Sequence, residues 1–412
     1  MKFQYRIALL VFVSCFFFCG QTQTKEASPD PSNEALTNEL SSEISNGADR
    51  IDQYLFLLEN KLVGLVVNNT SEVNGVHLVD TLNSLGINIK TIFAPEHGFR
   101  SDADAGASIA DGKDIVTGAP IISLYGSKKK PSSSDLSGLE MLVFDIQDVG
   151  ARFYTYISTM TYVMEACAEN NIPVLILDRP NPNGHYVDGP VLEEKHKSFI
   201  GMHPVPVVHG MTIAEYATMV NGEGWLANGV RCDLNYVLCE NYDHNTRYSL
   251  PFKPSPNLPN DDAIQFYPSL CFFEGTVISV GRGTDSPFQI FGHPQLPADA
   301  PLRFTPEPTA GASQPKLNGE LCYGYDVRNG EPMEFVDGQL NLDYLIFSYW
   351  LLKGMGDFYR KDGFFELLAG TDQLRQQINE GITAEEIRMS WRADLDNYKA
   401  IREKYLLYPD FE

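Results

Sequence analysis

Several patterns that mark common enzyme and binding classes are missing from this sequence. No GxGxxG motif follows its first predicted strand, which argues against a dinucleotide cofactor. The GxSxG nucleophile elbow and the HExxH metal helix are also missing, which excludes the hydrolase classes built on them. The 412 residues include 54 acidic and 31 basic side chains, a net charge of −23, without any basic stripe. We therefore expect no nucleic-acid partner.

Cysteine is scarce beyond the N-terminal region, and its spacing matches no CxxC or metal-finger pattern. An odd number of cysteines leaves at least one thiol unpaired in an oxidising compartment. We expect the cysteines to be small, buried, hydrophobic side chains. We predict no metal and no cofactor, with a carboxylate–histidine site assembled from separate loops as the alternative. The cysteines in question are Cys167, Cys232, Cys239, Cys271 and Cys322.

Residues 1–19 have the pattern of a secretory signal peptide. Lys2 and Arg6 form a cationic start, and the apolar run that follows is too short to span a bilayer. We expect lipid acylation at Cys19 in preference to Cys15, although phenylalanines stand where small residues are preferred; plain cleavage is the alternative.

Residues 20–47 are polar and predict a flexible tether. No later stretch reaches the roughly 18 apolar residues of a spanning helix. We therefore expect an exported protein of the periplasm or the outer-membrane-anchored cell envelope, which contacts the membrane only through a lipid anchor.

Short apolar runs alternate with helical segments in the first part of the folded body. This alternation predicts an α/β fold in which a doubly wound, mainly parallel, Rossmann-like sheet is covered on both faces. We expect that domain at 48–292, a smaller C-terminal α/β domain at 293–412, and a Pro- and Ala-rich connection at 294–315. The predicted strands are 64–68, 89–93, 120–124, 141–145, 173–178, 205–208 and 321–327, and the predicted helices are 76–86, 156–170, 341–354, 372–379 and 393–406.

Polar loops follow four of these strands, at the edge where doubly wound sheets bind ligands. The first loop holds Glu96 and His97 between Pro95 and Gly98, which fix a turn at the strand's end. A carboxyl group in a partly apolar cleft can keep its proton and protonate a leaving oxygen. A simple loop ion pair is the alternative interpretation.

The second loop holds Asp145, Gln147, Asp148 and Arg152, followed by an aromatic segment with Tyr154. These side chains can orient a water or bind sugar hydroxyls, whereas the structural alternative is a turn cap over a filled core.

The third loop holds Asp178, Arg179 and Asn181, where Arg179 can bind a carboxylate through two hydrogen bonds. The fourth begins at His209 and runs into Thr212, a predicted N-cap for the following helix. A turn formed by Pro, Asn and Gly explains the third loop equally well.

A later segment brings Glu274 and Arg282 within reach of the same cleft. Its GRGT stretch at 281–284 lacks the lysine and the spacing of a phosphate loop, so no nucleotide role is predicted.

Taken together, these loops resemble those of the bacterial exo-β-N-acetylmuramidases of glycoside hydrolase family 171. The resemblance covers essentially the whole chain after the tether and rests on APEHGFR, FDIQDVGARFYTY, DRPNPN, FEGT and GRGT, which begin at residues 94, 144, 178, 273 and 281. It implies a cell-wall recycling enzyme that releases terminal N-acetylmuramic acid (MurNAc) from MurNAc-GlcNAc and longer peptidoglycan glycans. It also implies that Glu96 is the catalytic acid, while the other loop residues line the cleft.

Glycoside hydrolysis usually needs a second carboxyl group, and the sequence leaves this assignment open among Asp145, Asp148, Asp178 and Glu274. Participation by the substrate's own N-acetyl group would remove the need for a protein nucleophile. Two other functional classes also stay open. One is a non-catalytic envelope lipoprotein that binds muropeptides, and the other is a metal-dependent hydrolase of another cell-wall bond.

Overall fold

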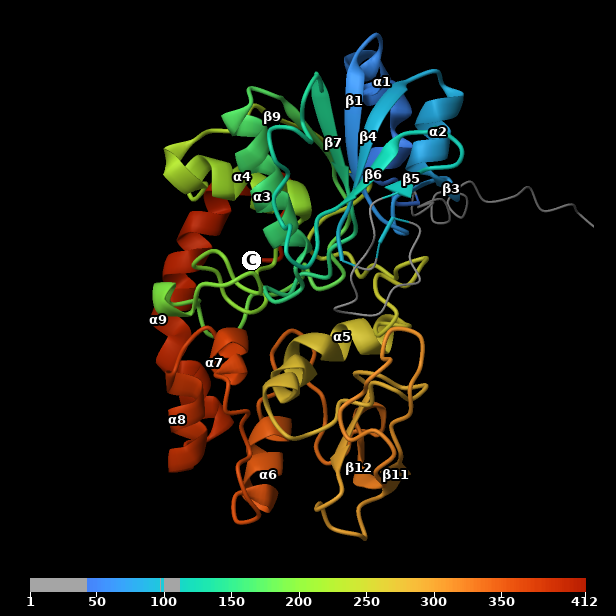
Figure 1. Cartoon of the computed structure of the whole chain (residues 1–412). Helices are drawn as coiled ribbons and strands as arrows, with labels where there is room; N and C mark the ends of the chain where they lie inside the picture. Colours follow the sequence, from blue (N-terminus) through green and yellow to red (C-terminus); the bar gives the residue numbers. More distant parts are fainter. Residues whose placement is uncertain (1–42, 97, 100–111) are drawn as a thin grey trace, which may run out of the picture. The chain divides into compact units, whose positions relative to one another are not determined.

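A seven-stranded sheet organises the first part of the folded chain (Figure 1). The computed structural model describes residues 43–412 except 97 and 100–111, so the predicted signal peptide, acylation site and residues 20–42 of the tether lie outside the described residues. The strand order is β5-β6-β4-β1-β7-β8-β9, and each neighbouring pair is parallel except β5 and β6. The strands are β1 (Leu62–Val67), β4 (Asn88–Ala94), β5 (Gly112–Lys113), β6 (Pro120–Ser123), β7 (Met141–Asp145), β8 (Val174–Leu177) and β9 (Leu234–Val237).

The two faces of this sheet pack into two separate cores. In β7, Met141 and Val143 belong to one core, and Leu142 and Phe144 belong to the other, because successive side chains of a strand point to opposite faces. The first core is completed by α1 (Leu55–Leu58) and α2 (Leu78–Ser84), and the second by α3 (Tyr156–Glu169) and α4 (Ile213–Glu223). Burial of both faces explains why these strands are continuous apolar runs. The predicted α/β, Rossmann-like fold class is confirmed.

One predicted strand is wrong. Residues 205–208 are buried, but Val208 makes only isolated bridges to Ala151 and Asp188 instead of joining the sheet. Pro204 and Pro206 lack backbone N–H groups and so prevent a regular ladder in this apolar run. The edge position is taken by β9, which the sequence pattern did not reveal because its middle two residues are exposed.

The later part of the chain holds a second sheet and five helices. In this antiparallel sheet, β12 (Cys322–Asp326) lies between β10 (Ile290–His293) and β11 (Leu302–Phe304). The predicted domain boundary after residue 292 falls within β10, the predicted connection contains β11, and the division itself stays a prediction. The helices are α5 (Asp261–Leu270), α6 (Asp343–Leu352), α7 (Phe364–Ala369), α8 (Gln373–Glu380) and α9 (Ala384–Arg402).

The ends of two predicted segments differ from the structure. Helix α9 begins at Ala384, nine residues earlier than predicted, because Thr383 and Glu386 form a capping box there. At the other end of the described chain, Ser45 pairs with Glu240 through two backbone hydrogen bonds of 2.8 and 3.1 Å. Residues 43–47, the last of the predicted tether, therefore belong to the folded unit.

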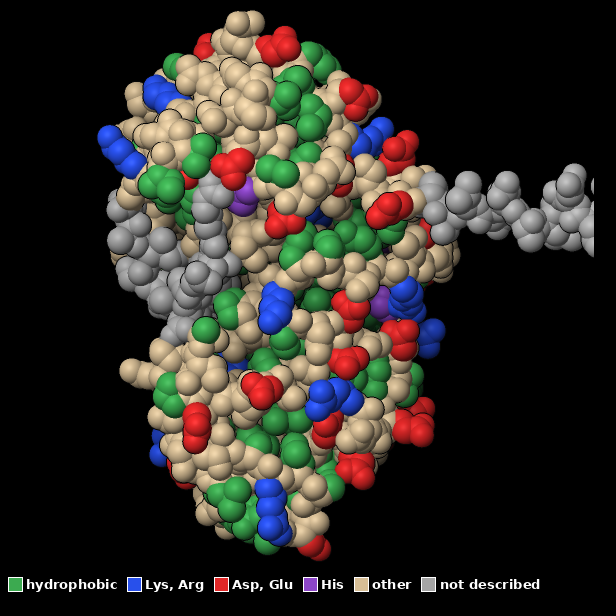
Figure 2. All heavy atoms as spheres, turned by 90° about the vertical axis from the view of Figure 1, so that its right-hand side faces the viewer, with side chains coloured by type: hydrophobic (Ala, Val, Ile, Leu, Met, Phe, Trp, Pro, Cys, Tyr) green, Lys and Arg blue, Asp and Glu red, His purple; other side chains and the backbone are tan. Residues whose placement is uncertain are grey.

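Three expectations from the sequence concern the surface charges, the helix lengths and the cysteines of the described residues. On the face that Figure 2 shows, Asp and Glu side chains are interspersed with Lys and Arg side chains. None of the helices in the described part of the chain has the length and hydropathy that a membrane span requires. The five cysteines beyond the N-terminal region are buried and unpaired, which confirms the prediction made for them.

Thr212 and Glu215 form a capping box at the start of α4. Thr212 caps this helix as predicted, since its hydroxyl accepts from the Glu215 backbone N–H and the Glu215 carboxylate accepts from the Thr212 N–H. We expect Thr212→Ala to lower the free energy of unfolding by about 0.5–2 kcal/mol. Urea unfolding beside Thr218→Ala, which removes a hydroxyl from the interior of the same helix, measures the difference. Equal stability of the two variants would contradict a capping role.

Candidate active site

Loops at the carboxyl ends of three sheet strands contribute to a cavity of about 960 Å³. Glu96 lies two residues beyond β4, Tyr125 lies two residues beyond β6, and residues 153–156 follow β7. Gly126 and Lys129 follow Tyr125 in the same loop, and the remaining lining comes from separate segments between residues 198 and 368. The cavity therefore lies where a doubly wound sheet is expected to bind its ligand.

Glu96 is held in place by its neighbours. Its Oε2 accepts a hydrogen bond from the Thr155 hydroxyl at 3.1 Å, and its backbone oxygen accepts one from the Tyr156 phenol at 3.5 Å. Tyr125 also hydrogen-bonds to the Glu96 side chain, and burial together with this carboxylate raises the pKa of Tyr125. Gly98 has a φ of 85°, so a glycine suits the turn that leaves the loop. The half-buried carboxyl group is thus both oriented and open to the cavity.

Glu274 is the other carboxylate that lines the cavity among the described residues. It belongs to the short 3-10 helix Cys271–Gly275, and its Oε1 pairs with Arg282 at 2.7 Å. Burial opposes the charge on Arg282, but this ion pair outweighs burial and raises the arginine pKa. A second contact, from Arg282 to the Gly311 carbonyl at 3.3 Å, fixes the guanidinium. The sequence predicted that Glu274 and Arg282 reach the same cleft, and both line this cavity.

Two lysines line the cavity in different ways. The ammonium of Lys316 donates to the backbone carbonyls of residues 273, 276 and 278 at 2.9, 2.6 and 3.0 Å, and burial lowers its pKa to about 8. Lys129 instead lies over the Phe199 ring, 4.4 Å from its centroid. Among the described residues, no carboxylate pairs with Lys129. Lys316 therefore holds the backbone together, whereas Lys129 keeps its charge available to a ligand.

An aromatic cluster forms much of the lining. The rings of Tyr154 and Tyr156 meet edge to face at 4.9 Å, and those of Tyr154 and Tyr267 at 5.9 Å. The Tyr154 hydroxyl donates to the Pro254 carbonyl at 2.7 Å. Tyr154, predicted as a substrate-binding residue, thus lines the cavity and is fixed by its own hydrogen bond.

Asp145 and Arg179 form a buried ion pair and do not line the cavity. The two oxygens of Asp145 accept from Arg179 at 2.6 and 3.0 Å, and both side chains are buried. Arg179 also donates to the Glu72 carbonyl at 3.1 Å. Burial raises the pKa of Asp145, and Arg179 opposes that rise. Because the guanidinium is already engaged twice by Asp145, the structure gives Arg179 a loop-holding position.

Four further residues that were predicted for the site are buried and do not line the cavity: Gln147, Asp148, Asn181 and His209. Gln147 donates to the carbonyls of Asp148 and Pro180 at 2.9 and 2.6 Å. Asp148 accepts from the Gly150 N–H at 2.7 Å and lies 3.6 Å from His209. Asn181 donates to the Met211 carbonyl at 2.9 Å. The bonds from Gln147 to Pro180 and from Asn181 to Met211 tie neighbouring loops to one another.

Arg152 and Asp178 are also buried away from the cavity lining. Arg152 donates to four carbonyls at 2.8–2.9 Å, those of Pro190, Val205, Leu368 and Ala369, and burial lowers its pKa to about 9. Asp178 accepts from the Ala214 N–H at 3.0 Å and the Tyr408 hydroxyl at 2.6 Å. These two charged groups join distant segments of the chain.

Of the predicted site residues, the structure brings Glu96, Tyr154, Glu274 and Arg282 together at the cavity. His97 lies outside the described residues, so its role stays a prediction. The described residues contain no group of three or more His, Cys, Asp or Glu side chains in a metal-binding arrangement.

Several residues that line the cavity were not predicted from the sequence. Tyr125 directly follows predicted strand 120–124, so its position at the carboxyl end of a strand is the signal that could have identified it. Thr155 lies in the aromatic segment but gave no chemical signal of its own. Lys129 and Lys316 lie in segments without a recognisable motif, and only the folded chain brings them to Glu96 and Glu274.

Comparisons with known proteins identify relatives over nearly the whole chain. The family model for the N-terminal part of the exo-beta-N-acetylmuramidase NamZ matches residues 63–262, and the model for its C-terminal part matches residues 265–408. The peptidoglycan beta-N-acetylmuramidase NamZ of Bacillus subtilis (strain 168) is 35% identical over 431 residues, covering 98% of this chain and 100% of the relative. The predicted resemblance is thereby confirmed.

Two solved structures share the fold. A DUF1343 family protein from Bacteroides fragilis NCTC 9343 is 46% identical and superposes with a TM-score of 0.82, covering 90% of this chain and 100% of that one. A second DUF1343 family protein from the same organism is 29% identical with a TM-score of 0.76, covering 89% and 99% of the two chains.

The buried position of Asp178 predicts an unusual pH dependence. Burial raises the pKa of Asp178 to about 6, partly offset by the hydrogen bond from Tyr408. An unfolded aspartate ionises near pH 3.9, so the folded state binds the extra proton between these values. The free energy of unfolding should therefore fall by about 2 kcal/mol, through this group, as pH rises from 4 to 7.

Asp178→Asn removes the titrating group and retains an oxygen acceptor. Urea unfolding at pH 4, 5, 6 and 7 gives the difference in stability between wild type and variant at each pH. We expect this difference to shift by about 2 kcal/mol across the range, against the wild type at higher pH. A difference that stays constant with pH would show that folding does not raise the pKa of Asp178.

Proposed function

The chain belongs to the exo-beta-N-acetylmuramidase NamZ family of glycoside hydrolases, and we propose that it releases terminal β-1,4-linked MurNAc from the non-reducing ends of peptidoglycan fragments. One observation carries this proposal. The cavity at the carboxyl ends of the sheet strands is lined by Glu96 and Glu274, together with aromatic and cationic side chains. A glycosidase needs a paired set of carboxyl groups in such a place.

Glu96 is proposed as the general acid. The hydroxyls of Thr155 and Tyr125 hydrogen-bond to its side chain and hold it toward the cavity. A proton donor must lie within hydrogen-bond reach of the leaving oxygen, and a carboxyl group oriented by its neighbours meets that requirement without rearrangement.

Glu274 is proposed as the second carboxylate. The aspartates that competed for this role, Asp145, Asp148 and Asp178, are buried outside the cavity lining and engaged by neighbouring loops. Glu274 lines the cavity, and its ion pair with Arg282 holds the carboxylate in the place that a base, a nucleophile or an amide-orienting group requires.

The substrate's lactyl carboxylate is proposed to bind Lys129. MurNAc differs from GlcNAc by this acidic ether substituent, so an enzyme that selects MurNAc needs a cation inside its cavity. Arg282 is paired with Glu274, and the Lys316 ammonium is surrounded by backbone carbonyls. The Lys129 ammonium, over the Phe199 ring, has no carboxylate partner among the described residues.

We also propose that the protein acts in the cell envelope, exported by its N-terminal segment and anchored through Cys19. The cationic start and the short apolar run that ends in cysteines support this proposal.

Replacement of Glu96 by Gln tests the catalytic assignment. Hydrolysis of a chromogenic β-MurNAc glycoside by residues 43–412 should fall at least about 100-fold in kcat, because the amide cannot donate the proton. Glu59→Gln, an exposed carboxylate outside the cavity, is the matched control and should keep wild-type activity. The wild type should also keep its activity after treatment with EDTA.

Three results would contradict this assignment. Full activity of Glu96→Gln would remove Glu96 from the mechanism. Loss of wild-type activity in EDTA, with recovery on adding a metal, would instead favour the metal-dependent hydrolase. Tight muropeptide binding without any turnover would favour a non-catalytic binding protein.

The proposed role of Lys129 predicts a defect limited to the substrate's charge. Lys129→Met should raise KM for the β-MurNAc glycoside about 10-fold and leave kcat within about twofold, since a charged hydrogen bond is lost from binding alone. A methyl ester of the lactyl group should bind wild type and variant equally. Lys128→Met, whose lysine pairs with Asp135 at 2.9 Å outside the cavity, is the control. If Lys129→Met still preferred the acid over the ester as strongly as the wild type does, Lys129 would not bind the lactyl carboxylate.

A further inference from the structure

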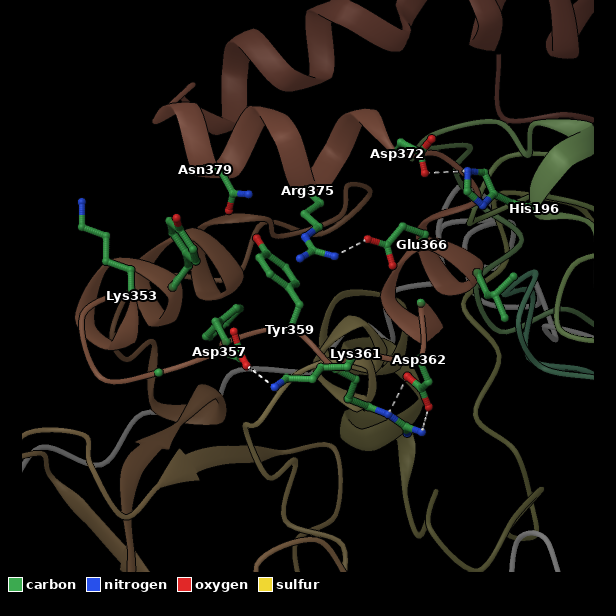
Figure 3. Close-up of a pocket in the computed structure, with 16 residues that line it drawn as sticks. His196, Lys353, Asp357, Tyr359, Lys361, Asp362, Glu366, Asp372, Arg375 and Asn379 are labelled. Carbon is green, nitrogen blue, oxygen red and sulfur yellow. Dashed lines mark hydrogen bonds and ion pairs between the residues drawn. The ribbon is translucent and has the colours of Figure 1, made fainter.

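A second pocket of about 710 Å³ lies beside the active-site cavity (Figure 3). Its lining comes from the end of α6, the segment 356–363, α7 and α8, with His196 from the earlier part of the chain. None of the residues predicted from the sequence as catalytic or substrate-binding lines it.

The two cavities share a wall. Arg360 and Leu367 line both of them. Between the cavities, Tyr359 forms an antiparallel bridge with Thr276, and the Arg360 N–H donates to the Gly275 carbonyl at 2.9 Å. The guanidinium of Arg360 also donates to the Glu274 carbonyl at 3.4 Å. The backbone that carries Glu274 is therefore bonded directly to the backbone that carries Tyr359, and the shared residues Arg360 and Leu367 make the two cavities neighbours.

Two buried polar atoms in this pocket find no hydrogen-bond partner among the described residues: the Tyr359 hydroxyl and Oε2 of Glu366. Tyr359 is only 6% exposed. Arg375 joins the two side chains, since it lies 4.6 Å over the Tyr359 ring and donates to Oε1 of Glu366 at 2.7 Å. Because an unsatisfied buried polar group costs about 1–3 kcal/mol, these atoms point to a ligand that supplies hydrogen bonds.

The side chains of the pocket favour a ligand rich in hydroxyl groups. Each of the four lining carboxylates pairs with a basic side chain, as the dashed lines in Figure 3 show. The pairs are Asp357 with Lys361, Asp362 with Arg360, Glu366 with Arg375, and Asp372 with His196. Lys353, which lies over the Trp350 ring, is the lining cation that has no carboxylate partner among the described residues. The unpartnered tyrosine hydroxyl and carboxylate oxygen match sugar hydroxyls, which both donate and accept, better than they match the carboxylates of a stem peptide.

We propose that this second pocket binds the sugars of the leaving chain, beyond the bond that is cleaved. This inference rests on the proposed function and deepens it, because it makes the enzyme prefer longer peptidoglycan glycans over disaccharides. The hydroxyl of Tyr359 and Oε2 of Glu366 then contact the leaving chain, while the terminal MurNAc stays near Glu96 and Glu274.

Tyr359→Phe removes the unpartnered hydroxyl and keeps the buried ring. We expect KM for the peptide-free tetrasaccharide MurNAc-GlcNAc-MurNAc-GlcNAc to rise about 3- to 10-fold, the range of one lost hydrogen bond. The kinetics of a chromogenic β-MurNAc glycoside, which has no leaving chain, should not change. Tyr344→Phe is the matched control, because its buried hydroxyl donates to the Met333 carbonyl outside both cavities.

The outcomes separate this inference from the proposed function. Failure of the wild type to cleave the chromogenic glycoside would reject the proposed function itself. Cleavage of that glycoside, with the same tetrasaccharide KM in wild type and Tyr359→Phe, would reject only the sugar-binding role of the second pocket. A variant that loses affinity for a peptide-bearing disaccharide but not for the tetrasaccharide would also reject that role, since the pocket would then bind the stem peptide.

Discussion

The buried ion pair between Asp145 and Arg179 is the contact from which the architecture of the site follows. The two residues stand at the carboxyl ends of β7 and of its neighbour β8, and two hydrogen bonds of 2.6 and 3.0 Å join them. Removing two charges from water is costly, and only close mutual contact with further hydrogen bonds offsets that cost. Loss of one partner would leave a buried charge without compensation. The loops after β7 and β8 must therefore keep this arrangement.

The rigidity of these loops explains how the cavity acquires its geometry. Gln147, Asp148 and Asn181 add short hydrogen bonds among the same loops. The chain that leaves them carries Tyr154 and Thr155 to the cavity wall, where Thr155 contacts Glu96. A catalytic acid is effective when its orientation is fixed before substrate binds, and the buried polar groups supply that fixed frame.

The sequence predicted the sheet, the helices and the position of Glu96, because continuous apolar strands and the ends of parallel strands leave clear patterns. It did not separate residues that line the cavity from residues that hold the loops. Asp178 and Arg152 follow strands as Glu96 does, yet their side chains turn into the protein and bind distant segments. That difference depends on contacts with α7 and the C-terminal residues, which local sequence does not encode. Tyr359 was missed for the same reason, since only its pairing with Thr276 brings it next to the segment that carries Glu274.

We propose that the enzyme removes MurNAc from the non-reducing end of a glycan. Mass spectrometry of the earliest products from MurNAc-GlcNAc-MurNAc-GlcNAc tests this specificity. We expect free MurNAc and a trisaccharide that begins with GlcNAc as the products, and no disaccharide, because the trisaccharide has no terminal MurNAc left to remove. Early release of disaccharides would show an endo-acting enzyme, and an intact tetrasaccharide in the presence of folded protein would contradict the assignment as a glycosidase.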